Sequence, residues 1–570
     1  MKVVLAVVFA ILQCSPAGSG ELLYNGIQLP DTWPPRGSVF PTALVTPSYL
    51  KSPPALIPID VGRQLLMDDF LIEKTTLKRS FHEPEYYEGN PIIKPDQPWE
   101  LTSFNYRNQP DFPGPVAGMR GNSPMAMPYS DGVWFDPQDK LFKMWYFGGE
   151  GPSPTKSLST TCYATSTDGI HWEKPKLRAV RWLDVKETNI VHLGKRDSAT
   201  IWLDHGAKKA GERYKMWLGW ALHKSPDGIH WTRVKEFRPA GDRTTFFYNP
   251  FRRRWVFSIK APDGTWQQGL GRTRLYYETE NFFRPPKWGS DPVDEKGDVV
   301  LWTVADGADP KWEGMEDTPD LYNLDAVAYE SMLLGLFTIW RGDTTELRES
   351  GRPKLNEVFV GFSRDGFHWD RPVRRPFLPI SEKRGDWNWG NVQSAGGCCL
   401  VVGDKLYFFV SGRVGASRPG STSHAHGGST GLAILRRDGF ASMDAGPEVG
   451  TLTTRPVKFA GKRLFVNVDA DQGELTAEIL GEDGKVIEPF QRTNCEVVRQ
   501  DSTCCSLSWK GATDLSSLNN RPVRFRFHLK NGQLYAFWVS PDETGASHGY
   551  VAAGGPDFTG PTDTVGRSAD

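Results

Sequence analysis

Four aspartates near the starts of strand-forming runs have the residue type and spacing for acid–base chemistry. They are Asp131, Asp197, Asp242 and Asp325. Asp131 precedes the turn residue Asp136 by five positions, while Asp197 and Asp242 precede Asp204 and Asn249 by seven each. Because each of these three aspartates is an odd number of residues from its own turn, the alternation of a strand places all three on the equivalent face. If the strands surround a common axis, the carboxylates meet at one mouth.

Carboxylates that share one cavity repel each other, so at least one of them should have a raised pKa. Glycoside hydrolysis needs such a division, because one carboxyl must protonate the leaving oxygen while another stays ionised as nucleophile or base. The four aspartates therefore predict catalysis on a glycosidic bond. The alternative is structural, with the aspartates capping strands or binding neighbouring loops.

Several other residues are candidates for substrate binding. Arg196 and Arg243 adjoin two of the aspartates and could hold them charged or bind sugar hydroxyls. Trp387 and Trp389 could stack on a sugar ring or pack inside the fold, and nearby Asn391 takes the place of a fifth aspartate. His424 and His426 lie in a Gly- and Ser-rich loop that is either a binding loop or plain surface. Without a third ligand nearby, this His pair predicts no metal site, and no cofactor is expected.

Glu330 ranks below the aspartates as a catalytic acid. It follows Asp325 by five residues, the same offset as Asp136 from Asp131, which places it at a hairpin turn.

The elements that position these residues are marked by a repeated phrase. It reads STDGIHW at 166–172, SPDGIHW at 225–231 and SRDGFHW at 363–369. The aspartate can accept backbone N–H bonds of its turn, the glycine supplies a positive φ, and the tryptophan packs back as an anchor. These residues are expected to be structural staples.

Five units beginning at Tyr129, Arg196, Gly241, Asn323 and Trp389 each contain an alternating strand, a turn and an aromatic-rich strand. Repeated short strands without helical stretches predict an all-β protein with a five-bladed β-propeller, whose inner strands line a central channel. After residue 450 the pattern changes to alternating strands with Asp-Gly and Asn-Gly turns, which predict a C-terminal β-sandwich.

The expected division of the chain is a signal peptide at 1–20, a Pro-rich extended arm at 21–58, the propeller at 59–449, the sandwich at 450–541 and a Gly-rich tail at 542–570. The protein is therefore expected to be secreted or periplasmic, and lipid attachment through Cys14 is the weaker alternative. No later segment is apolar enough to span a membrane. In an exported chain, a disulfide from Cys495 to Cys504 or Cys505 is also expected.

The overall composition limits the number of domains and the classes of binding partner to expect. The 570 residues suit two domains, and 24% charged with 39% hydrophobic residues is typical of a globular protein. A net charge of −1 gives no reason to expect nucleic acid or an anionic membrane. The 21 tryptophans suit a β-rich core or a carbohydrate-binding surface. The oligomeric state does not follow from the sequence.

Together these features resemble the five-bladed propeller glycosidases of glycoside hydrolase families 32 and 43. The resemblance covers about Pro58 to Asp444, and a sandwich after the propeller is similar to family 32. The segment GKRDS at 194–198 looks like the family's Arg-Asp-Pro motif with Ser198 in place of proline. This similarity implies a transition-state-stabilising role for Asp197 and makes Asp131 the counterpart of the family nucleophile.

The sequence also departs from that family. The Asn-Asp-Pro-Asn-Gly signature and the third-blade Glu-Cys pair are absent, and the third unit offers Asp242 instead. The segments SDGVWFDP, NLDAVAYES and NWGNVQSAGG look like a group of exported bacterial family 32-like proteins. The leading hypothesis is thus an exported glycosidase acting on a plant or algal polysaccharide. The alternatives are a non-catalytic glycan-binding propeller and a glycoside phosphorylase.

Overall fold

The computed structural model describes residues 20–36, 45–101, 124–151, 158–194, 196–261, 272–289, 297–312, 319–341, 355–415 and 427–566. It is nearly all-β, as the sequence predicted. Helical structure in these ranges is limited to α1 (Ser48–Lys51) and the short 3-10 segments η2 (Ala210–Glu212), η3 (Arg492–Asn494) and η4 (Ser516–Leu518). No helix in these ranges is long and apolar enough to cross a membrane.

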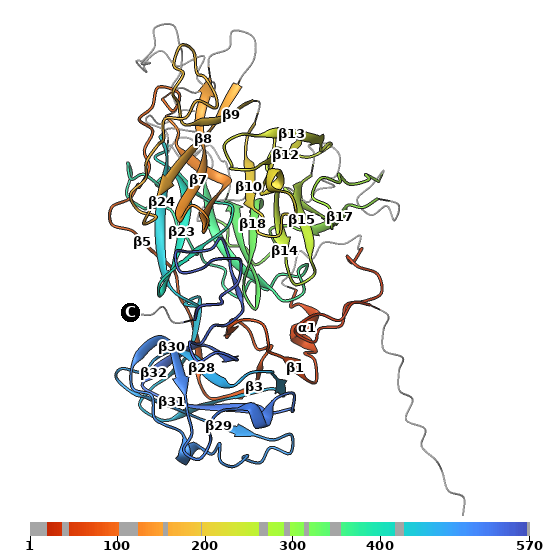
Figure 1. Ribbon diagram of the computed structural model, residues 1–570, viewed down its shortest axis with the longest axis vertical. Coiled ribbons are helices and arrows are strands. Elements are labelled where there is room, and N and C mark those ends of the chain that lie inside the picture. The colour runs from red at the N-terminus through yellow and green to blue at the C-terminus, as the bar shows by residue number, and fades with distance from the viewer. Residues whose placement is uncertain are drawn as a thin grey trace, which may run out of the picture.

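The upper body in Figure 1 is built from five antiparallel sheets, in four of which consecutive strands of the chain pair in order. The strands are β6 (Met127–Asp136), β7 (Leu141–Gly151), β8 (Leu158–Ser166) and β9 (Ile190–Gly194); β10 (Ala199–Leu203), β11 (Tyr214–Leu218), β12 (Ala221–Ser225) and β13 (Thr232–Glu236); β14 (Thr245–Asn249), β15 (Arg254–Lys260), β16 (Arg274–Thr279) and β17 (Val300–Thr303); β18 (Asp320–Glu330), β19 (Met332–Trp340) and β20 (Asn356–Ser363); and β21 (Asn391–Ser394), β22 (Leu400–Val402), β23 (Lys405–Arg413) and β24 (Gly428–Arg436) with β5 (Glu85–Tyr86). Short connections favour such antiparallel meanders.

The repeated phrase forms the same turn in all three places. Asp168 Oδ1 accepts the N–H groups of Ile170 and His171, both at 2.8 Å, and Asp168 Oδ2 contacts His171 Nδ1 at 2.7 Å. Asp227 and Asp365 make the equivalent contacts. The glycine after each aspartate has a φ of 77°, 77° and 86°, respectively. These hydrogen bonds stabilise the turn that ends each strand, which is the structural role that was expected.

Removing one staple should cost stability. We expect Asp168→Ala to lower the free energy of unfolding by about 1–3 kcal/mol through the lost turn hydrogen bonds, as measured by urea denaturation. Asp184→Ala serves as control, because Asp184 is fully exposed in its pair with Arg181, and should leave the unfolding midpoint unchanged. Unchanged stability together with lost activity in Asp168→Ala would instead give this turn a functional role.

The lower body in Figure 1 contains two larger sheets and one two-stranded sheet. One has the order β30 (Asp501–Leu507), β28 (Arg463–Asp469), β32 (Gly532–Ser540), β25 (Ala441–Ala445) and β4 (Lys78–Phe81), with β2 (Gln64–Leu65) beside β32. The other has the order β29 (Glu474–Leu480), β31 (Arg524–Lys530), β26 (Gly450–Thr454) and β3 (Ile72–Thr75), and β1 (Ile57–Pro58) pairs with β27 (Val457–Lys458). Residues 57–81 thus complete sheets whose other strands come from beyond residue 440.

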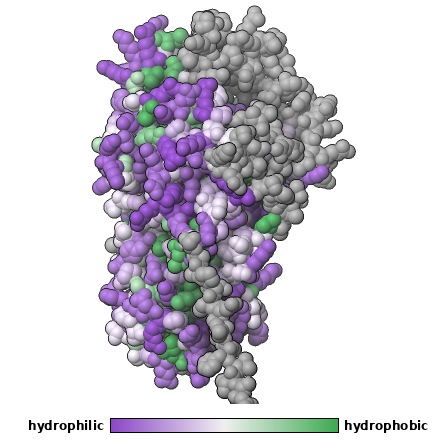
Figure 2. All heavy atoms as spheres, turned by 90° about the vertical axis from the view of Figure 1, so that its right-hand side faces the viewer, coloured by the Kyte–Doolittle hydropathy of each residue, from purple (hydrophilic) through white to green (hydrophobic). Residues whose placement is uncertain are grey.

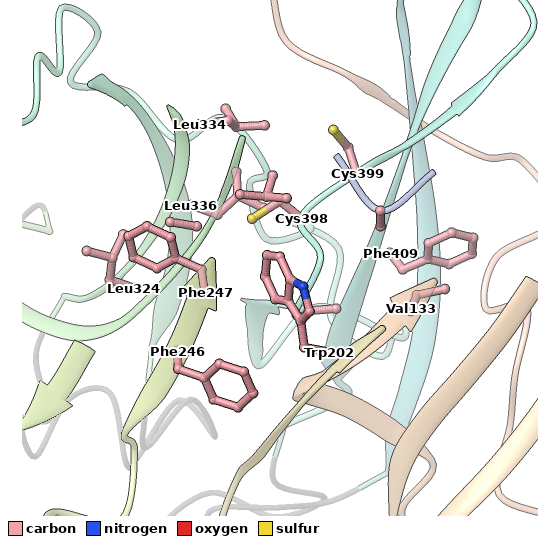
Figure 3. Packing of buried hydrophobic residues seen from close by; sticks show 14 of the residues in the cluster. Val133, Trp202, Phe246, Phe247, Leu324, Leu334, Leu336, Cys398, Cys399 and Phe409 are labelled. Carbon is pink, nitrogen blue, oxygen red and sulfur yellow. The ribbon is translucent and has the colours of Figure 1, made fainter. Parts of the chain in front are cut away.

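Two main hydrophobic cores correspond to these bodies. In the larger one, Trp202 of β10 lies between Phe246 and Phe247 on one side and Val133 on the other (Figure 3). Its ring centroid is 4.5 Å from that of Trp134. The smaller core takes side chains from both lower sheets and from the N-terminal arm, including Leu23 and Tyr49. The arm is therefore packed as part of a core.

The C-terminal segment binds three sheets of the upper body. Its short strand β33 (Tyr550–Val551) pairs with the end of β18. Ala553 O accepts the N–H of Phe135 at 3.0 Å, and Gly554 O accepts the N–H of Val401 at 2.9 Å. Three sheets that are distant in sequence are held together by this one segment.

A buried ionic cluster around Arg63, in the segment that follows the arm, connects both bodies. Arg63 is fully buried, lies 2.9 Å from Asp438 and 3.6 Å from Glu330, and donates to Thr503 O at 2.7 Å. Its guanidinium also stacks 4.2 Å from the Trp538 ring centroid. Glu330 is the last residue of β18, with a φ of 49°, and sits in this cluster. Its position at the hairpin turn is the one that the residue spacing predicted.

The expected disulfide from Cys495 does not form. The Cys495 thiol is free and buried, and its Sγ accepts the N–H of Ala477 at 3.3 Å. The prediction of a bond to Cys504 or Cys505 was wrong, since Cys504 Sγ donates to Thr544 O at 3.7 Å and Cys505 Sγ accepts from Gln500 Nε2 at 3.2 Å. Figure 2 shows one face of the molecule, whose described surface is mainly hydrophilic, with hydrophobic residues in small separate groups.

Candidate active site

The first strands of the five sheets are joined by hydrogen bonds at the positions of the aspartates. Ala199 N–H donates to Asp131 at 3.1 Å, and Ser198 Oγ donates to Asp242 O at 3.1 Å. Thr245 Oγ1 then donates to Leu324 O at 2.6 Å, next to Asp325. Asp325 in turn accepts hydrogen bonds from β6 and β21. The series passes from sheet to sheet and returns to the first, so the aspartates gather around one axis.

Asp131 is held in a buried ion pair with Arg196. The guanidinium binds the carboxylate with two nitrogens, at 2.5 and 2.7 Å, and both side chains are completely shielded from solvent. Arg196 also donates to Thr161 Oγ1 at 2.8 Å. Burial raises the pKa of Asp131, and the arginine offsets part of this rise. With all of its surface covered, Asp131 positions Arg196 and the start of β10.

Asp325 is buried among neutral donors. Its Oδ2 accepts from Ser394 Oγ at 2.6 Å, Asn323 Nδ2 at 2.9 Å and Ser130 Oγ at 3.1 Å. Burial raises the pKa of Asp325 to about 7, although these bonds and two nearby arginines act in the opposite direction. Its Oδ1 is buried and has no hydrogen-bond partner in the described part of the chain. A proton on Oδ1 would therefore have no acceptor among the described residues.

Asp197 and Asp242 are the open carboxylates of the group, with side chains 33% and 44% exposed. They come from neighbouring sheets, and their side chains lie close enough to interact with each other. Lys260 Nζ lies 2.7 Å from Asp242 Oδ1. Although burial acts to raise it, the ammonium group of Lys260 lowers the pKa of Asp242 to about 2. Asp242 is thus ionised over the ordinary pH range.

Two buried arginines link the open and the buried carboxyls. Arg243 Nε lies 3.3 Å from Asp197 Oδ2, and its guanidinium lies over the rings of Tyr129 and Tyr322, at 4.3 and 5.0 Å from their centroids. Arg274 donates to the backbone oxygens of Arg243 and Tyr322. Burial lowers the pKa of Arg274 to about 9. These contacts hold the Asp242 segment against the Asp325 strand.

The other predicted binding residues lie in different surroundings. Trp387 is half-buried, and its ring packs against the backbone of Gly412 and Gly431, where an added Cβ would come within 2.2 Å of it. Trp389 is 6% exposed, with Arg384 over its ring at 5.3 Å. Asn391 is the buried first residue of β21. His424 and His426 lie outside the described residues.

The sequence reasoning missed four contributors to the site: Lys260, Arg274, Ser130 and Ser394. The first two carried a usable signal. An antiparallel hairpin at Asn249-Pro250 returns β15 so that Lys260 comes back beside Gly241, and β16 then pairs Arg274 with Lys260. Ser130 and Ser394 belong to other sheets than Asp325, so only the closed arrangement brings them to it.

No protein-family model and no curated protein matches the chain. A glycosyl hydrolase structure from Bacteroides ovatus is 14% identical, with 66% of this chain and 97% of that chain covered and a TM-score of 0.35. An N-acetylgalactosamine deacetylase from F. plautii, in complex with blood group B trisaccharide, is 12% identical, with 64% of this chain and 96% of that chain covered and a TM-score of 0.37. A fructofuranosidase from Schwanniomyces occidentalis, complexed with fructose, is 10% identical, with 72% of this chain and 94% of that chain covered and a TM-score of 0.32. At this level of similarity, activity and substrate rest on the site itself.

Proposed function

We propose that the protein is an exported glycoside hydrolase that cleaves a poly- or oligosaccharide at the end of the channel where Asp197 and Asp242 reach solvent. In this proposal the five upper sheets are the blades of a five-bladed β-propeller, and the two lower sheets form a β-sandwich. The leader-like first residues of the sequence support export.

One observation carries the proposal. Two carboxyls on adjoining sheets have opposite pKa shifts, since Asp242 is held ionised with a pKa of about 2 and Asp325 keeps a proton up to about pH 7. Environments that push the pKa values of two carboxyls apart distinguish the acid from the base. Thr245 and Arg274 connect the two segments directly.

In the proposed reaction, Asp325 donates its proton to the glycosidic oxygen as the bond to the leaving sugar breaks. Asp242 stays ionised on the solvent side and stabilises the positive charge that develops on the sugar ring, or activates the attacking water. Asp197 adds a second carboxylate oriented by Arg243. Asp131 and Arg196 are positioning residues, because the guanidinium binds both carboxylate oxygens of Asp131, whereas Asp325 Oδ1 has no partner among the described residues.

The test is sugar release by the mature protein from soluble plant and algal polysaccharides and aryl glycosides, beside Asp242→Asn. Activity requires Asp325 protonated and Asp242 ionised. It should therefore be level between about pH 4 and 6 and fall as pH rises through about 7. The Asn variant should lose turnover and keep the thermal midpoint. A descending limb below pH 5 in the wild type would remove Asp325 from the acid role.

Glycan binding without cleavage is the second candidate, and a specific observation favours it. Asp197 and Asp242, the two open carboxylates, each form an ion pair with a basic side chain. Carboxylates held in this way can accept sugar hydroxyls without changing protonation state. If the wild type and Asp242→Asn both bind a glycan by calorimetry and neither releases sugar, this function replaces the hydrolase.

A further inference from the structure

A cavity lies at the end of the same strands opposite to the candidate active site. It has a volume of about 680 Å³ and lies where β10 and β14 end, around Asp204 and Tyr248. Asp197 and Asp242 precede the other ends of these strands. Six or seven residues at about 3.3 Å each place the cavity roughly 20 Å from the open carboxylates. It is therefore separate from the candidate active site.

The walls of this cavity are aromatic. Trp202 and Trp255 form part of the lining with ring centroids 6.0 Å apart, and Tyr248 lies 4.9 Å from Trp255. Phe283 and Tyr550, both half-buried, line other parts of it. Tyr248 and Phe283 keep part of their surface open. Flat aromatic side chains of this kind bind the C–H faces of sugar rings as well as apolar molecules.

The rim of the cavity is charged, and its cations are in excess. Lys209 pairs with Glu212 at 3.5 Å, and Lys215 pairs with Asp204 at 2.5 Å. The third acid of the rim, Glu280, is bound by Arg254 at 2.8 Å.

Two cations of the rim remain for a ligand. Lys208 and Arg253 are exposed and make no ion pair with any residue in the described ranges. Arg253 acts electrostatically on the phenols of Tyr248 and Tyr550, so its charge lies beside the aromatic walls.

We propose that this cavity is a second carbohydrate-binding site, for a short oligosaccharide that carries carboxylate or sulfate groups. A purely apolar ligand would cover the polar rim without giving its groups new partners. A neutral sugar would leave Lys208 and Arg253 unused. An anionic sugar places its ring against the aromatic walls and its acid group at these two cations. The proposal does not depend on cleavage at the other end of the channel.

Isothermal titration calorimetry with three probes tests it: trigalacturonic acid, a sulfated galactan trisaccharide and uncharged galactotriose. The variant is the double substitution Lys208→Gln, Arg253→Gln. The matched control is Lys209→Gln, Arg254→Gln, which removes the neighbouring cations that already have acidic partners. Because charge-assisted bonds are lost, the double variant should bind at least one acidic probe with a Kd about tenfold or more above that of the wild type. The control variant should raise the Kd far less. Tyr248→Leu should weaken it as well.

Asp242→Asn separates the two sites. It should leave binding of the acidic probe unchanged while abolishing any sugar release, so failure of either proposal is seen without the other. The second site is refuted if no acidic probe binds the wild type at millimolar concentration, or if galactotriose binds as tightly. Equal affinity of the double variant and the wild type, or loss of binding in Asp242→Asn, would also refute it.

Discussion

Replacing Asp325 by asparagine is expected to lower kcat/KM at pH 6 by about 10²–10⁴-fold, the contribution of a general acid, and to leave the fold intact. Asparagine has the same shape, and one of its polar atoms can still accept from Ser130 and Ser394, which donate to Asp325 Oδ2 at 3.1 and 2.6 Å. The measurement is turnover of the best substrate from the glycan screen. Retention of full activity would exclude Asp325 as the proton donor.

Ser394→Ala is the matched control for that experiment. The Ser394 hydroxyl lowers the pKa of Asp325 by donating to its carboxylate. Its removal should keep the enzyme active and move the descending limb of the pH profile upward from about 7. A limb that stays in place would show that another group controls it.

The same carboxyl should affect stability in a defined direction. Its pKa in the folded protein, about 7, lies above its ordinary value of 3.8. Between these values the folded state binds more protons than the unfolded state, so the Asp325 contribution to stability falls as pH rises from about 4 to 7. In Asp325→Asn this part of the pH dependence should be missing from urea unfolding curves.

Replacing Arg63 by alanine is expected to lower the free energy of unfolding by about 3–5 kcal/mol, the usual cost of breaking a fully buried ion pair from one side. Asp438 and Glu330 would each lose a charged partner in a site with no solvent, and Trp538 would lose its stacked guanidinium. Thermal and urea unfolding measure the loss.

Arg463→Ala controls for the removal of an arginine. Arg463 pairs with Glu543 at 2.6 Å at the surface, where Glu543 is 83% exposed, and such pairs contribute about 1 kcal/mol or less. If Arg63→Ala lowered the free energy of unfolding no more than this control does, the ionic cluster would make no special contribution to stability. A biphasic unfolding curve for Arg63→Ala would show that the cluster couples the upper and lower bodies.

Local pattern was enough to predict the all-β class, the turns of the repeated phrase and the place of Glu330. These features depend on residues close together in sequence, such as Asp168 with Ile170 and His171. The spacing of the aspartates also indicated that they would be brought together.

The different environments of the aspartates could not be predicted in this way. Asp197 and Asp242 stand before their strands, whereas β18 begins at Asp320 and carries Asp325 in its middle. That difference in depth makes Asp325 buried and its pKa high. The partners that decide its chemistry come from other sheets, so alternation within one strand contains no information about them. Asp131 was expected to be the counterpart of the family nucleophile, and the structure shows it covered by a bidentate arginine.

The pairing of residues 57–81 and of the C-terminal segment has a consequence for the order of folding. β4 pairs with β25, and β33 pairs with β18, across more than two hundred residues of intervening chain. Contacts of such long range form slowly, because the entropy of closing the loop is lost before the contact is gained. The upper sheets can pair within themselves as they are synthesised, but their common closure at Ala553 and Gly554 waits until those residues have been synthesised. Until then, the chain is a set of unclosed β-meanders whose free edges are open to a chaperone or to aggregation.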